Sequence, residues 1–69
     1  MRLEVRLHGF GEPQRSVALE PEATYADVLA ALDIPSESVL VFSNEQPVPV
    51  DDPVDRTATV RVVRIVSGG

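Results

Sequence analysis

The chain has 69 residues, 43% of them hydrophobic and 25% charged, with a formal net charge of −5 and a pI of about 4.5. This size and composition predict one folded domain with a thin core, and the acidic balance makes nucleic acid and anionic membranes poor partners. The absence of cysteine and the single histidine exclude a disulfide framework and a zinc site built from thiolates or several histidines.

All six basic residues are arginine, and the chain contains no lysine. One explanation is the lysine-poor, acidic proteome of a salt-adapted organism. The other is functional, since a chain without lysine cannot accept an acyl group on its own side-chain amines. No apolar run approaches the ~20 residues of a membrane span, and the N-terminus lacks a signal pattern, so we expect a cytoplasmic protein.

Residues 2–8 alternate strictly between polar and apolar side chains. This period of two predicts a strand with one buried and one solvent-facing side. Residues 9–13 are typical of a turn, and residues 15–20 alternate again, so the two segments predict a β-hairpin. The expected buried positions are Leu3, Val5, Leu7, Val17 and Leu19.

The hydrophobic period then changes to that of a helix. Four apolar residues share one helical face at the spacing i, i+3, i+4, i+7, namely Tyr25, Val28, Leu29 and Leu32. Thr24 is the expected N-cap, and Asp27 three residues later completes a weak form of the capping box. Pro35 is expected to end this single helix after about ten residues, because the residue before a proline is pushed out of the α region.

The remaining segments predict further strands. Residues 39–42 are β-branched and aromatic, residues 47–49 contain two prolines and suit only a short edge strand, and residues 59–66 form a long, valine-rich central strand. One helix and four or five strands predict an α+β fold, a β-grasp, with the helix on one face of a mixed sheet and the first and last strands parallel at its centre. The domain would comprise residues 1–66, followed by a flexible tail at 67–69.

The side chains supply little for autonomous catalysis, so we expect that the chain is not an enzyme. His8 falls on the solvent-facing side of the first strand, where an ordinary surface residue is the simpler interpretation. Asp51, Asp52 and Asp55 could hold a hard cation loosely, but a solvated loop explains them better. We therefore expect no catalytic residue, no metal and no resident cofactor.

The end of the chain carries the clearest functional signal. The last predicted strand runs to Val66 and is followed only by Ser67, Gly68 and Gly69. Terminal glycines often mean only a frayed end. Here, however, four residues from Val66 extend about 13 Å, and a backbone without Cβ atoms can enter a channel too narrow for other residues. On a chain of this fold and length, the terminal carboxylate of Gly69 is a candidate site of activation.

Three stretches resemble the ubiquitin-like sulfur carriers and small archaeal modifier proteins, a group that includes the ubiquitin-related modifier, the molybdopterin synthase small subunit and the thiamine sulfur carrier. They are Thr24-Tyr25-Ala26-Asp27-Val28, Gln46-Pro47-Val48-Pro49 and Val60 through Gly69. The resemblance spans the whole chain. It implies that a ubiquitin-activating-type enzyme uses ATP to adenylate Gly69, with Gly68, Ser67 and Val66 recognised as the tail. The product would be an isopeptide with a target lysine, or a thiocarboxylate for sulfur transfer in tRNA thiolation or molybdopterin synthesis.

The resemblance also implies a partner-binding patch on the open face of the sheet. We expect the chain to be a monomer. The expected members are Val41, Val63 and Arg61, with His8 beside them and Phe10 at the hairpin tip. Core packing is the alternative for each of the two valines. Because the body is acidic, we expect the matching surface of the activating enzyme to be basic. Two alternatives stay open: a non-covalent interaction domain with an idle tail, and the small subunit of a molybdopterin-synthase-like complex.

Overall fold

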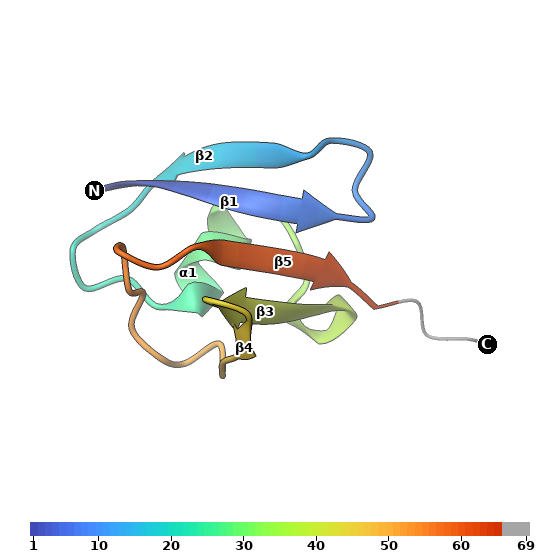
Figure 1. Ribbon diagram of the computed structural model, residues 1–69. Coiled ribbons are helices and arrows are strands. Elements are labelled where there is room, and N and C mark those ends of the chain that lie inside the picture. The colour runs from blue at the N-terminus through green and yellow to red at the C-terminus, as the bar shows by residue number, and fades with distance from the viewer. Residues whose placement is uncertain (66–69) are drawn as a thin grey trace.

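The computed structural model describes residues 1–65, in which a single α-helix lies against one face of a five-stranded sheet (Figure 1). The predicted tail residues Val66, Ser67, Gly68 and Gly69 lie outside the described residues, as does the end of the predicted domain at residue 66. The elements in chain order are β1 Arg2–His8, β2 Gln14–Ala18, α1 Tyr25–Ala31, the 3-10 helix Ser36–Ser38, β3 Val39–Ser43, β4 Gln46–Pro47 and β5 Val60–Arg64.

The sheet has the order β2-β1-β5-β3-β4, and its two central strands are parallel. β1 pairs with β5 in the register Val5↔Val60 to His8↔Val63, and all other neighbours are antiparallel. The chain crosses from the first hairpin to the second half of the sheet through α1. This arrangement confirms the predicted β-grasp and the central position of the last strand.

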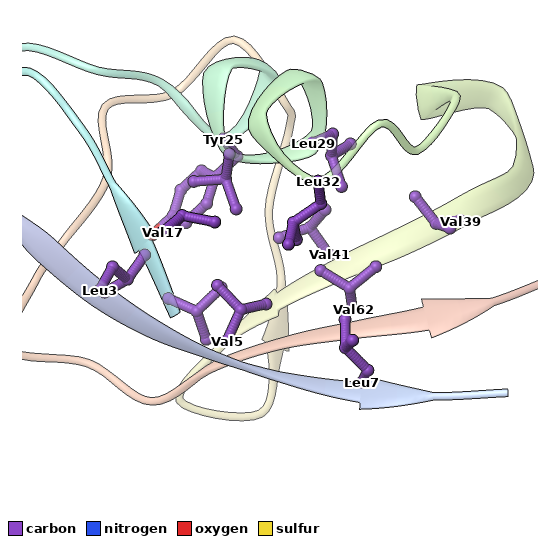
Figure 2. Packing of buried hydrophobic residues seen from close by; sticks show 12 residues of the cluster. Leu3, Val5, Leu7, Val17, Tyr25, Leu29, Leu32, Val39, Val41 and Val62 are labelled. Carbon is purple, nitrogen blue, oxygen red and sulfur yellow. The ribbon is translucent and has the colours of Figure 1, made fainter. Parts of the chain in front are cut away.

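The core lies between α1 and the inner face of the sheet (Figure 2). The period-two pattern of β1 is confirmed, because its three apolar residues are all buried and its polar residues are exposed. The helical period is also confirmed, since Tyr25, Val28, Leu29 and Leu32 are each at most 6% exposed. The strands contribute the other members of the cluster: Leu3, Val5, Leu7, Val17, Val39, Val41, Val60 and Val62.

The start of α1 follows the predicted capping pattern, but its end does not follow the prediction. The Asp27 carboxylate accepts hydrogen bonds from the Thr24 amide at 2.9 Å and from the Thr24 hydroxyl at 3.3 Å. The helix has seven residues rather than about ten, and it ends before Pro35 is reached. Asp33 has a φ of 59°, and the Ile34 amide donates to the Leu29 carbonyl at 2.9 Å. This left-handed residue turns the chain and closes the helix locally.

The edge strand after β3 also differs from the expected range of 47–49. Ser43 pairs with Gln46 across a two-residue turn in which Asn44 and Glu45 have φ values of 50° and 68°. Such a turn matches the twist of a hairpin and fixes its register. The paired segment of β4 is therefore Gln46–Pro47, one residue earlier than the proline pattern suggests.

We expect the stability of the domain to rise with ionic strength. The chain has eleven side-chain carboxylates and only six arginines. The described residues form only two ion pairs, Arg15–Glu12 at 3.7 Å and Arg61–Glu45 at 3.8 Å. A core of this size provides about 3–5 kcal/mol, so screening about 1 kcal/mol of repulsion should raise Tm by about 4–8 °C between ~0.05 and ~2 M NaCl.

A charge variant supplies the control for this measurement. Changing the exposed residues Glu20, Glu22 and Glu37 to Gln should raise Tm at low salt and reduce its further rise with salt. A wild-type Tm that does not change over this range would contradict the expectation, and an equal rise in both proteins would assign the effect to salt exclusion instead.

Candidate functional site

The chain leaves the sheet at the end of its central strand. β5 ends at Arg64, and the Ile65 amide donates to the Ser38 carbonyl at 2.8 Å. This hydrogen bond anchors the last described residue to the segment between α1 and β3. The base of the C-terminal segment is therefore held by two parts of the fold, and the roles of the four residues beyond it stay predictions.

The open face of the sheet, on the side away from α1, is formed by alternate residues of β1, β5 and β3. The strand register arranges them in two rows across the sheet. One row is His8, Val63 and Leu40, and the other is Arg6, Arg61 and Phe42. A row with two apolar residues, Val63 and Leu40, therefore lies beside a row that contains two guanidinium groups.

The predicted orientation of the last strand is confirmed. Val60 and Val62 are fully buried, whereas Arg61 and Val63 are half-buried and lie on the open face. His8 is exposed on the same face, next to Val63. Two of the predicted partner-binding residues, Arg61 and Val63, are therefore neighbours on a surface that a partner could reach.

The predicted position of Val41 is wrong. Val41 is only 3% exposed and belongs to the core, because it pairs with the buried Val62 and shares its face. Leu40 pairs with Val63 instead and is 48% exposed. Residues 39–42 are apolar at every position, so their sequence has no alternation that could have identified Leu40.

Phe10 lies away from these rows. It is half-buried against the core cluster, and the Arg64 guanidinium stands 5.9 Å from the centre of its ring. The two residues line an open groove of about 480 Å³ whose apolar wall includes Leu7, Leu32 and Ile34. Gly9 has a φ of 90°, and a Cβ there would come within 3.1 Å of the Arg64 Cβ, so glycine permits this close approach. The partner contact expected of Phe10 would belong to this groove rather than to the open face.

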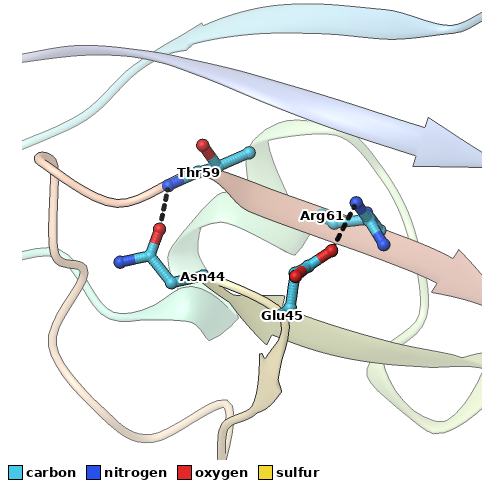
Figure 3. Close-up of polar contacts among 4 residues, drawn as sticks. All are labelled: Asn44, Glu45, Thr59 and Arg61. Atoms are coloured by element: carbon cyan, nitrogen blue, oxygen red, sulfur yellow. Dashed lines mark hydrogen bonds and ion pairs between the residues drawn. The ribbon is translucent and has the colours of Figure 1, made fainter.

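Arg61 is incompletely satisfied on the open face (Figure 3). Its Nη2 is 3.8 Å from Glu45 Oε1, and the Glu45 side chain is 81% exposed. The buried Nε of Arg61 has no hydrogen-bond partner among residues 1–65. Asn44, in the same turn as Glu45, fixes the turn against β5 by accepting a hydrogen bond from the Thr59 amide at 3.1 Å. Sequence reasoning identified Arg61 but not its neighbours Arg6 and Glu45.

The net charge of the chain does not describe this face. Three of the six arginines lie on the open face: Arg2, Arg6 and Arg61. The paired strands place one carboxylate on this face, that of Glu4, and the turn between β3 and β4 adds Glu45. The other nine carboxylates lie on other elements and loops. The open face is therefore locally cationic on an acidic molecule.

In the acidic loop after β4, the carboxylate of Asp55 is engaged in local hydrogen bonds. The Asp55 carboxylate accepts bonds from the Thr57 hydroxyl at 2.6 Å and the Thr57 amide at 2.9 Å, and these bonds lower the pKa of Asp55. Among residues 1–65, no three His, Cys, Asp or Glu side chains are placed to hold a metal ion. No helix within these residues is long and apolar enough to cross a bilayer.

Comparisons with known proteins agree with this architecture. The family model of small archaeal modifier protein 2 matches residues 1–66. The chain is 34% identical over 67 residues to small archaeal modifier protein 2 from Haloferax volcanii, covering 97% of this chain and all of that protein. It is 38% identical over 69 residues to an uncharacterized protein from Archaeoglobus fulgidus, with full coverage of both chains.

Two solved structures share the fold, each with full coverage of both chains. They are SAMP1 from Haloferax volcanii, with a TM-score of 0.76 and 19% identity, and a chain of the complex of subunits 1 and 2 of molybdopterin-converting factor from Helicobacter pylori 26695, with a TM-score of 0.67 and 17% identity. From the match over residues 1–66 and the 34% identity to a relative that covers 97% of this chain, the protein belongs to the small archaeal modifier protein 2 family.

Proposed function

We propose that this chain is activated at Gly69 and then transferred, either to target lysines as a protein modifier or to sulfur as a carrier. The observation that carries the proposal is the family match over residues 1–66 of a β-grasp chain that continues as Ser67-Gly68-Gly69. The central strand β5 leads directly toward this segment. A docked domain would thereby deliver a terminal carboxylate to the partner, and the two glycines before it add no side chains that could block its entry.

The chemistry of activation uses the carboxylate of Gly69 and the phosphates of ATP. The carboxylate attacks the α-phosphorus, pyrophosphate leaves, and a glycyl-adenylate forms in the activating enzyme. A lysine amine then attacks the acyl carbon, loses a proton and displaces AMP to give an isopeptide. Alternatively, hydrosulfide (HS⁻) attacks the same carbon, loses its proton and displaces AMP to give a thiocarboxylate. The activating enzyme and the acceptor provide the catalytic groups, and this chain provides the acyl group.

Mass spectrometry of the protein isolated from its own cells tests the proposal. The chain has no cysteine, so a thiol-alkylating reagent should label it only when its C-terminus is a thiocarboxylate. A conjugate digested with trypsin should retain residues 65–69 on the target lysine, because Arg64 is the last cleavage site. Chain produced in cells without the activating enzyme is the control. Finding neither label nor remnant in the native cells would contradict the proposal.

The likeness to a chain of the molybdopterin-converting factor complex supports a second candidate, in which the tail enters the active site of a larger subunit. In that case the thiocarboxylate form should copurify with a stable partner protein and the tryptic remnant should be absent. Co-purification under non-denaturing conditions, followed by the same alkylation, distinguishes this arrangement from protein tagging.

A further inference from the structure

We propose that Arg6 and Arg61 form a carboxylate-binding site at the centre of the open face, and that the activating enzyme docks there with an acidic side chain beside apolar ones. Naming the enzyme rests on the proposed function. The site itself rests on the placement of the two arginines, on the unsatisfied donor of Arg61 and on the apolar residues around them.

The two arginines lie directly opposite each other on neighbouring parallel strands. The register pairs Arg6 of β1 with Arg61 of β5, and strands in such a sheet are about 4.8 Å apart. Like charges placed directly opposite each other in a sheet are destabilising. Among residues 1–65, Arg6 has no ion pair within 4.0 Å and Arg61 has one. A carboxylate placed between the two guanidinium groups would relieve their repulsion.

The existing contact of Arg61 leaves most of its hydrogen-bonding capacity unused. A guanidinium has five N–H donors in a planar fork that fits a carboxylate. The contact with Glu45 is long, at 3.8 Å, and its carboxylate is solvated, so it is a weak ion pair. The buried Nε lacks a hydrogen-bond partner within residues 1–65. An incoming carboxylate could accept from this donor more completely than Glu45 does.

Glu45 places a carboxylate of the same chain beside Arg61, and a carboxylate from a partner could displace it. It has a φ of 68°, a conformation in which glycine is favoured and other residues are strained. Its side chain accepts no hydrogen bond from the turn within the described residues, and its one polar contact there is with Arg61 (Figure 3). Its replacement by Gln should therefore leave the site more available to a partner's carboxylate.

Apolar side chains on the same face explain how such a contact would gain strength. Leu40 is 48% exposed, the half-buried Phe42 pairs with Arg61, and the half-buried Val63 lies two residues after Arg61 on the same face. A partner that covers this apolar surface would remove water from the ion pairs, and charge-assisted hydrogen bonds of arginine to carboxylate are among the strongest polar contacts in proteins. The partner surface should therefore be acidic at its centre. This proposal differs from the expectation of a basic partner surface, which was based on the net charge.

The affinity of the purified activating enzyme for a set of variants, measured by titration calorimetry, tests the inference. Arg6→Glu and Arg61→Glu should each weaken binding at least about 30-fold. Arg15→Glu is the matched control, because Arg15 pairs with the buried Val5 and its exposed ion pair lies off the open face, so this variant should change the affinity less than about threefold. Glu45→Gln should tighten binding, and higher salt should weaken the wild-type complex.

Several results would overturn the inference. Equal loss of affinity for Arg15→Glu and Arg61→Glu would show that only net charge matters, and unchanged or tighter binding of Arg6→Glu would exclude a carboxylate at this site. Binding of total tRNA from the same cells, lost in Arg61→Glu while enzyme affinity is unchanged, would assign the face to RNA. A dimer that Arg61→Glu dissociates, again without effect on the enzyme, would assign it to a second copy.

Folding and the proposed function are checked separately from the site. Circular dichroism melts should show that the substituted chains keep the fold. Arg6→Gln and Arg61→Gln replace any variant that fails to fold, and the same direction of effect is expected for them. ATP–pyrophosphate exchange with saturating wild-type chain tests whether Gly69 is adenylated at all. Absence of exchange would contradict the proposed function, whereas exchange with equal affinity of all variants would contradict only the docking site.

Discussion

Removal of Gly68 and Gly69 is expected to abolish both conjugation and sulfur transfer while leaving the domain folded. The core cluster ends at Val62 and the sheet ends at Arg64, so the deletion removes none of the residues that form the core or the strands. The change in the free energy of unfolding should stay within about 0.5 kcal/mol, as for surface changes away from packed features. By contrast, the terminal carboxylate of the shortened chain would no longer reach the ATP-binding site of the activating enzyme.

Complementation of a deletion strain and a thermal melt of the purified chain measure the two effects. Ser67→Ala is the matched control, because it changes a neighbouring tail residue and keeps the diglycine; it should complement. A truncated chain that still complements would rule out both covalent hypotheses and support the non-covalent interaction domain. A truncated chain that no longer folds would show that the tail contributes to the domain, against our expectation.

Aspartate substitutions at two adjacent positions of β5 should have opposite consequences. Val62 is fully buried beneath α1, whereas Val63 is half-buried on the open face. Val62→Asp would place an unpaired carboxylate in the core, which costs about 3–5 kcal/mol and so matches the whole stability expected of a domain this small. This variant should be largely unfolded. Val63→Asp should keep the fold, with a loss of less than about 1 kcal/mol.

The two variants also separate folding from partner recognition. Circular dichroism and denaturant titration report stability, and the rate of adenylate formation at Gly69 reports docking. Val63→Asp should slow adenylation severely, because it adds a negative charge beside Arg61 and removes an apolar contact. Val41→Asp extends the comparison to β3, and it should unfold the chain as Val62→Asp does, because Val41 is 3% exposed. A folded Val62→Asp or an unfolded Val63→Asp would contradict the inward and outward assignment of β5.

The open face of the sheet shows why local charge and net charge must be considered separately. The chain carries −5 overall, yet two arginines stand side by side on its open sheet face. Added salt should therefore have opposite effects on the two processes. It should stabilise the isolated domain by screening carboxylate repulsion, and it should weaken a complex that depends on arginine–carboxylate pairs. Measuring Tm and affinity over one salt series would show both trends in the same protein.

The sequence by itself determined the elements whose hydrophobic period is unambiguous. Strict alternation defined β1 and its buried face, four apolar residues at helical spacing defined the buried side of α1, and the valine-rich run defined β5 as a central strand. These predictions hold because burial imposes a period of two on a strand and of 3.6 on a helix, and a one-residue slip would expose the whole apolar set. The terminal diglycine was equally visible, since it is a chemical feature of the chain.

Tertiary structure alone decided which residue of β3 faces outward and which side chains of the open face are neighbours. Residues 39–42 are apolar throughout, so only pairing with β5 could turn Val41 inward and leave Leu40 exposed. The parallel pairing of β1 with β5 brought Arg6 next to Arg61, although the two lie near opposite ends of the chain. Local sequence patterns report burial along one segment, whereas cross-strand neighbours depend on the register between segments. That register is fixed by packing of the complete core, and so the local charge of the open face could not be obtained from composition.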